Sequence, residues 1–240
     1  MSLPLKVSIG SLLPWLWRCV RYGLIGAATF VGLSIAWVWF YGFAHPPETM
    51  LMGIRRHDGM DIQYTYVPIS QISPNLVRAV ISAEDTKFCS HHGFDLEQIK
   101  SALNDAEDGG RLRGASTISQ QTAKNAFLWP GRGFIRKGME AWFTLVSEVL
   151  WSKTHTMEVY LNVAEWGDGL FGAEAAAQAR FGKSARDLTE YEAALLAAVL
   201  PNPNDWRVAP PGPYVQKRTR TLQARMAVVQ RDGLDRCVLR

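Results

Sequence analysis

The sequence predicts a mainly α-helical fold with one N-terminal transmembrane helix. An uncharged apolar run near the N-terminus is long enough to cross a membrane, and most of the remaining chain places apolar residues at helical spacing behind capping residues. Little of the chain is left for β-sheet. The chain has 240 residues, and the part after residue 45 is long enough to bury a core as a single domain.

The predicted membrane span covers residues 22–44, which include no charged side chain. As a helix this run would be about 34 Å long, enough to cross a hydrocarbon core of roughly 30 Å. A cleaved signal peptide is the alternative, but its apolar core would be shorter, and the late aromatic cluster is typical of a membrane interface. Because Lys6, Arg18 and Arg21 precede the span, we expect residues 1–21 to be cytoplasmic and everything after the span to lie outside.

Residues 45–72 are predicted to form a connector, because prolines interrupt them and only residues 62–67 have short extended character. Residues 73–240 form the outer domain, where capping pairs and apolar spacing predict helices. The expected helices begin at Ser73-Pro74, at Asp95, at about Ser116, at Ile135 (ending at Trp151), at Thr189 (ending before Pro201) and at Tyr214 (ending at Gln230).

Charge and cysteine content set weak limits on function. The net charge of +4 suits work beside anionic headgroups or on a phosphorylated substrate, and nucleic acid is not an expected partner outside the membrane. Cys89 and Cys237 would share a compartment that permits disulfides, but sequence separation says nothing of their distance, and we expect free thiols. No spacing of cysteine and histidine indicates zinc.

Glu84 ends an apolar helical stripe formed by Val77, Val80 and Ile81. Partial desolvation and the negative end of the helix dipole would both disfavour its ionised form, which suits a general base. The alternative is a carboxylate that only reaches solvent or pairs with a lysine. Polar residues crowd the following turn, in which Asp85 could orient or cap, and a structural role for His91 is as well supported as a functional one.

A second group of polar residues follows, in the segment 114–127. Read as a helix, this segment places Thr117, Gln120 or Gln121, and Lys124 on one polar stripe. Hydroxyl and amide groups can bind sugar hydroxyls, and a lysine can bind phosphate, so the stripe suits a sugar pyrophosphate. An ordinary capped surface helix is the alternative.

A third group combines cations with an acid. Arg132, Arg136 and Lys137 form a positive cluster, and Glu140 shares a helix face with Arg136. A surface ion pair is one interpretation. If these residues face one cleft, they could instead hold a pyrophosphate, with Glu140 either orienting the cations or ligating a divalent cation, Mg²⁺ or Mn²⁺.

Three of these segments fit motifs that occur together in one family. The pattern E-D-x-x-F-x-x-H-x-G begins at Glu84, and R-K-x-x-E begins at Arg136. The pattern G-x-S-T-x-x-Q-Q-x-x-K-N begins at Gly114 and includes Ser116 and Asn125. The chain resembles the monofunctional biosynthetic peptidoglycan glycosyltransferases, relatives of the glycosyltransferase domain of class A penicillin-binding proteins.

Two further motifs extend the resemblance, so that it covers about Pro68 to Pro203. A fourth pattern, K-x-x-I-L-E-x-Y-L-N, begins at Lys153, with Thr156 and Met157 in place of the usual Ile-Leu. A fifth spans residues 172–183 and has arginine where an aromatic residue is common. These departures affect packing positions. No serine and lysine motif of a transpeptidase is present, which favours the monofunctional form.

The resemblance implies a lysozyme-like bilobal glycosyltransferase domain that polymerises lipid II into β-1,4-linked glycan strands by inverting transfer, with release of undecaprenyl diphosphate. Glu84 would be the general base and Glu140 a second catalytic residue. The residues expected to bind substrate are Ser116, Thr117, Gln120, Gln121, Lys124, Asn125, Arg132, Arg136 and Lys137.

Two other functions are alternatives to glycan polymerisation. A lytic transglycosylase also uses one glutamate, but it has no pyrophosphate to neutralise, and Arg136-Lys137 argues against it. An inactive membrane-anchored scaffold that binds lipid II is the other, against which the intact Glu84 and Glu140 speak. Besides lipid II and the growing glycan strand, the expected partners are the bacterial inner membrane, with the catalytic domain on its periplasmic side, and cell-wall synthesis or division proteins. No organic cofactor is expected.

Overall fold

The computed structural model describes residues 9–107, 116–131 and 133–239 and is mainly helical, as predicted. A small sheet of order β1-β3-β2 joins the helices, with β1 parallel and β2 antiparallel to β3. The elements are α1 Ile9–Phe40, α2 Met50–His57, β1 Gln63–Tyr64, α3 Pro74–Glu84, α4 Leu96–Glu107, α5 Ile118–Phe127, α6 Phe134–Leu150, α7 Lys153–Val163, β2 Glu165–Gly167, β3 Leu170–Phe171, α8 Ala173–Phe181, α9 Glu190–Val199 and α10 Pro213–Arg231.

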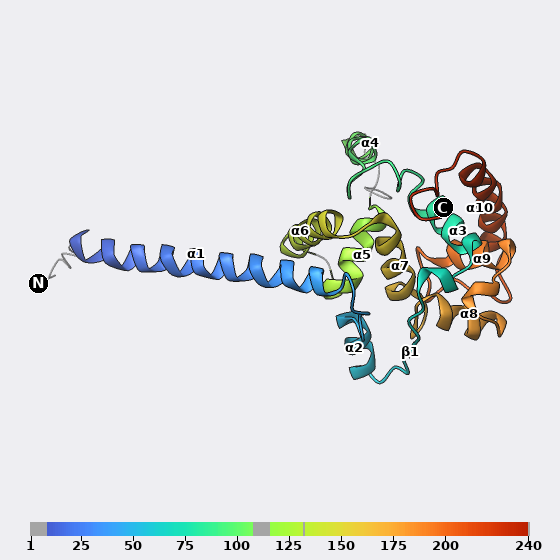
Figure 1. The fold of residues 1–240 in the computed structure, drawn as a ribbon, viewed down its shortest axis with the longest axis horizontal. Helices are drawn as coiled ribbons and strands as arrows, with labels where there is room; N and C mark the ends of the chain where they lie inside the picture. The colour runs from blue at the N-terminus through green and yellow to red at the C-terminus, as the bar shows by residue number, and fades with distance from the viewer. Residues whose placement is uncertain (1–8, 108–115, 132, 240) are drawn as a thin grey trace, which may run out of the picture.

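The N-terminal helix α1 extends far beyond the rest of the chain (Figure 1). Its segment Pro14–Phe40 is long and apolar enough to cross a membrane. The helix begins earlier than the predicted span of residues 22–44 and ends at Phe40, because the chain turns over residues 41–44. Trp37 and Tyr41 pack against Phe127 of α5, so the end of α1 is anchored in the outer part of the molecule.

The outer part contains two separate apolar cores, which agrees with the bilobal fold that the resemblance implied. The first core unites α3, α8, α9 and α10 and defines the main lobe. The second unites the end of α1 with α5 and α6 and defines the anchor lobe. Helix α7 contributes to both, since Tyr160 belongs to the main-lobe core and Val159 to the anchor-lobe core. In Figure 1 this helix lies between α6 on one side and α3 on the other.

Most predicted helices form close to the expected residues. Ser73 caps α3 through a hydrogen bond from Asn75, Asp95 accepts from the backbone of Gln98, and Thr189 forms the capping box of α9. Helix α6 runs within one residue of its predicted bounds, and Leu150 at its end is 40% exposed although it falls on the apolar spacing of this helix. Its outward position follows from α6 covering the core with only one face.

The connector contains structure that the sequence did not reveal. Helix α2 forms at Met50–His57, where Thr49 is the N-cap and Met52 is fully buried. This helix is short, and its glycine and three consecutive basic residues obscure the apolar spacing in the sequence. Helix α7 secures the rest of the connector: Glu158 accepts hydrogen bonds from Tyr66 Oη (2.6 Å) and Ile69 N (2.7 Å).

Cys89 and Cys237 form a disulfide, so the expectation of free thiols is wrong. The residues lie 148 apart in sequence, and the C-terminal tail that follows α10 brings them together. Arg78 of α3 donates to Asp235 at 2.8 Å, and Thr154 of α7 donates to the carbonyl of Cys237 at 3.0 Å. These contacts hold the tail beside the end of α3.

Candidate active site

Glu84 is the last residue of α3, at the helix end that the sequence predicted. Val77, Val80 and Ile81 are fully buried behind it, while Glu84 itself is partly exposed. Its Oε2 accepts a hydrogen bond from Nε2 of Gln121 at 2.8 Å. A carboxylate fixed at a helix end, with one oxygen held by an amide, retains acceptor capacity for an incoming proton.

The turn after Glu84 fastens the two lobes together. Asp85 Oδ2 accepts from the backbone N–H of Ile118 at 3.0 Å and lies 2.9 Å from Nε2 of His91. Gly93 adopts a positive φ, and a Cβ there would lie 3.0 Å from Thr144 Cγ2. Asp85 therefore caps α5 and fixes its start relative to Glu84, and His91 supports that carboxylate.

Thr117 and Gln120, both predicted to bind substrate, form the capping box of α5 instead. Thr117 Oγ1 accepts from Gln120 N at 3.1 Å and donates to the carbonyl of Gly93 at 2.6 Å, and both side chains are buried. Helix α5 therefore begins at Ile118, later than the predicted start near Ser116, which is exposed and does not line the pocket. Thr117 and Gln120 therefore position the helix, and their predicted contact with substrate stays a prediction.

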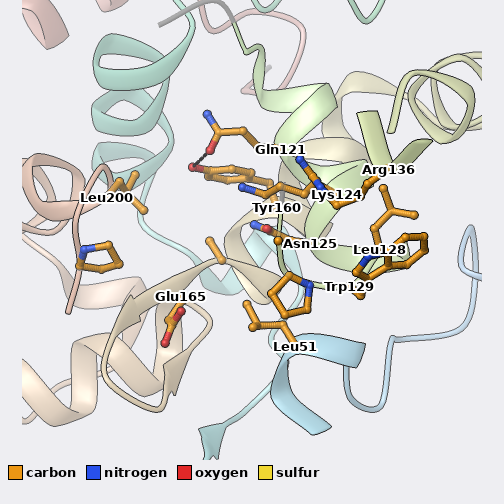
Figure 2. A pocket seen from close by; sticks show the side chains of 14 residues that line it. Leu51, Gln121, Lys124, Asn125, Leu128, Trp129, Arg136, Tyr160, Glu165 and Leu200 are labelled. Atoms are coloured by element: carbon orange, nitrogen blue, oxygen red, sulfur yellow. Dashed lines mark hydrogen bonds between the residues drawn. The ribbon is translucent and has the colours of Figure 1, made fainter. Parts of the chain in front are cut away.

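A pocket of about 310 Å³ lies between the lobes, beside α2. Helix α5 contributes Gln121, Lys124 and Asn125, and α6 contributes Arg136. Figure 2 shows these polar side chains with Tyr160 of α7, whose hydroxyl donates to Gln121 Oε1 at 3.4 Å. The remaining lining residues are Leu51, Leu128, Trp129, Pro130, Gly131, Ala164, Glu165, Leu200 and Pro203. Gln121 thus joins Glu84 to the pocket.

The cations of the pocket are organised around Glu140. This carboxylate is buried and contacts both Arg136, at 3.3 Å, and Lys137. Burial lowers the pKa of Lys124, an effect that Glu140 and Glu84 oppose and that Arg136 and Lys137 increase. Nε of Arg136 is buried and makes no hydrogen bond within the described residues. A crowded positive cluster with an unused donor suits a bound anion.

The surroundings of Glu140 do not fit a divalent-cation site. Arg136 and Lys137 already occupy its two oxygens, and no group of three or more metal-ligating side chains gathers anywhere in the part of the chain that the structure describes. The geometry favours the interpretation in which Glu140 orients cations. Arg132, also predicted to bind substrate, lies outside the described residues.

The sequence did not predict two of the residues that line the pocket. Tyr160 belongs to the fourth motif but had no assigned role; burial raises the pKa of its hydroxyl well above the ordinary value, with Glu84 and Asp85 adding to the effect. Glu165 carried no signal, because one acid after an apolar helix is common. Only the fold brings it to the pocket wall opposite Lys124 and Arg136 (Figure 2).

The chain is similar to known proteins along most of its length. A family model described as Transglycosylase matches residues 53–228, which include every residue that lines the pocket except Leu51. A biosynthetic peptidoglycan transglycosylase of Rhodospirillum centenum is 52% identical over 231 residues, covering 95% of this chain and 98% of the relative. Relatives with the same name from Caulobacter vibrioides and Pseudomonas aeruginosa are 52% and 49% identical, each over 82% of this chain and over 86% and 88% of their own lengths.

Proposed function

The chain belongs to the transglycosylase family and is a peptidoglycan glycosyltransferase, and from this premise we propose that it polymerises lipid II with Glu84 as general base. The observation that carries the assignment is that Gln121 connects a helix-end carboxylate to a pocket lined by two cations. Gln121 contacts Glu84 at 2.8 Å and lines the pocket together with Lys124 and Arg136.

In the proposed reaction, the 4-hydroxyl oxygen of the acceptor sugar attacks C1 of the donor MurNAc. The hydroxyl proton passes to the Glu84 carboxylate as the new C–O bond forms. The bond between C1 and the pyrophosphate oxygen breaks, and the undecaprenyl diphosphate leaves with the electron pair from the opposite face. The anomeric centre is therefore inverted, and the product is a β-1,4 linkage.

The negative charge that develops on the leaving diphosphate is neutralised by Lys124 and Arg136. The buried, unused Nε donor of Arg136 supports this role. Glu140 keeps Arg136 and Lys137 in place and is therefore a positioning residue. The scheme does not require a divalent cation bound by Glu140, and polymerisation with and without a chelator tests whether the substrate diphosphate carries one.

Helix α1 is proposed to span the inner membrane with residues 1–21 in the cytoplasm and the lobes on the periplasmic side. The outer face of α6 supports contact with the bilayer, because Leu145 and Val149 are exposed there and form an apolar groove with Ile35 of α1. Confinement to the layer that holds a lipid-linked substrate raises its effective concentration.

Gel analysis of the products from purified lipid II tests this function, with and without a chelator. We expect glycan strands without the chelator, and the sample with the chelator shows whether a divalent cation on the diphosphate contributes. Release of fragments from purified sacculi would support a lytic transglycosylase instead, and binding of labelled lipid II without polymer would support an inactive scaffold. Loss of polymer on chelation would require a metal in the mechanism.

A further inference from the structure

The pocket has two chemically different ends. Lys124 and Arg136 stand on the side of α5 and α6, whereas Glu165, the first residue of β2, stands on the opposite side (Figure 2). The Glu165 side chain is 13% exposed. A ligand that fills this pocket therefore meets cations at one end and a carboxylate at the other.

The Glu165 carboxylate has loosely bound partners. Arg55 of α2 lies 3.3 Å from Oε1, and Asn204 donates to the same oxygen at 3.4 Å. Burial raises the pKa of Glu165, and Asp168 adds to the effect, although Arg55 and Asn204 oppose it. The carboxylate oxygens therefore have lone pairs left for stronger donors.

The charge at this end of the pocket selects a class of group. Because Arg55 already balances the carboxylate, a ligand here need not be cationic, and neutral O–H or N–H donors fit best. Apolar side chains of Leu51, Leu200 and Pro203 line the same region. Hydrogen-bond acceptors beside apolar surface match a sugar ring, which has hydroxyl and acetamido donors at its edge and C–H groups on its faces.

We propose that Glu165 is a specificity-determining residue that accepts hydrogen bonds from hydroxyl or acetamido N–H groups of the donor saccharide. The diphosphate of the same substrate lies at Lys124 and Arg136. This inference rests on the proposed function, and it assigns to one pocket both ends of the sugar diphosphate. The competing explanation is that Glu165 only fastens α2 to β2 through Arg55.

The test compares two ligands that share a diphosphate but differ in the sugar. Binding of lipid II and of farnesyl diphosphate is measured with the full-length protein in detergent. We expect Glu165→Gln to weaken lipid II binding about tenfold and to change farnesyl diphosphate binding less than about twofold. Lys124→Met should weaken both ligands. Glu97→Gln, which neutralises an exposed acid of α4, is the matched control and should change neither.

Each outcome has a definite meaning. Unchanged lipid II binding in Glu165→Gln, or an equal loss for both ligands, would overturn the sugar contact. Arg55→Met keeps the carboxylate but removes the ion pair, and a loss of lipid II binding equal to that of Glu165→Gln would assign Glu165 a purely structural role. Unchanged farnesyl diphosphate binding in Lys124→Met would contradict the proposed function itself, whatever Glu165→Gln does.

Discussion

The main lobe and the anchor lobe bury their cores in different ways. The main-lobe core is made largely of alanine, valine and leucine from helices that pack on one another, with Leu196 fully buried. The anchor-lobe core is richer in aromatic side chains and includes Val38 of α1 and Tyr41, which follows it. Phe127 stacks on Phe143 at 4.9 Å and meets Trp37 edge-on at 5.4 Å.

This difference matches a division of chemical roles. The main lobe closes its core without the membrane helix, and it carries Glu84. The anchor lobe closes its core only with α1, keeps apolar side chains exposed on α6, and carries Lys124 and Arg136. The proposed proton acceptor thus belongs to the self-contained lobe, and the proposed diphosphate site belongs to the lobe that we place beside the bilayer, where a lipid-linked diphosphate would arrive.

The sharpest test of this division is Glu84→Gln. The amide cannot take the acceptor proton, so turnover should fall by about 10² to 10⁴, while the melting temperature stays close to that of the wild type. Polymerisation of lipid II is the measurement, with Glu97→Gln as the control. Near-normal turnover would show that Glu84 of the main lobe is not the proton acceptor.

On the anchor lobe, Lys124→Met should lower kcat/KM for lipid II by about 10² to 10³, since the developing charge loses one cation. A pH profile sharpens this test. Because burial lowers the pKa of Lys124, its charge is lost at a lower pH than that of an ordinary lysine, and activity should decline on the alkaline side. Lys124→Arg keeps its charge and should move that decline to higher pH. If activity declines at the same alkaline pH in the wild type and in Lys124→Arg, a group other than Lys124 causes the decline.

The same substitution in the main-lobe core and on the exposed face of α6 tests how the two lobes use their apolar side chains. Leu196→Ala should lower the free energy of unfolding by about 2 to 5 kcal/mol, because a fully buried side chain leaves a cavity. Leu145→Ala on α6 should change it by less than about 0.5 kcal/mol in detergent, because this side chain is 51% exposed. Denaturant unfolding gives both values, and equal losses would contradict the contrast between the lobes.

The smallest effect is expected at the outer face of α6. Val149 is 83% exposed, so Val149→Lys should leave stability and activity in detergent unchanged but reduce polymerisation in liposomes several-fold, since a charge would enter the apolar layer. Val228→Lys, at an exposed position of α10 in the main lobe, is the control. Equal activity of both variants in liposomes would place the α6 face in water.

Local sequence signals predicted much of this fold. Caps at Ser73 and Thr189 and apolar spacing in α3, α6 and α10 identified helices because these signals act within one or two turns. Helix α2 was missed because it is short and depends on packing of Met52. The disulfide was missed because 148 residues separate Cys89 from Cys237, and only the folded tail brings them together.

The sequence by itself determined the chain's class: a helical glycosyltransferase with an N-terminal helix long and apolar enough to span a membrane, Glu84 at a helix end and cations on two other helices. Only the tertiary structure decided which of these residues meet. In the folded chain, Gln121 donates a hydrogen bond to Glu84, and Glu165 lines the pocket. Thr117 and Gln120 form a buried capping box. Helical periodicity is a property of neighbouring residues, whereas a pocket forms between segments whose distance depends on how the whole core packs.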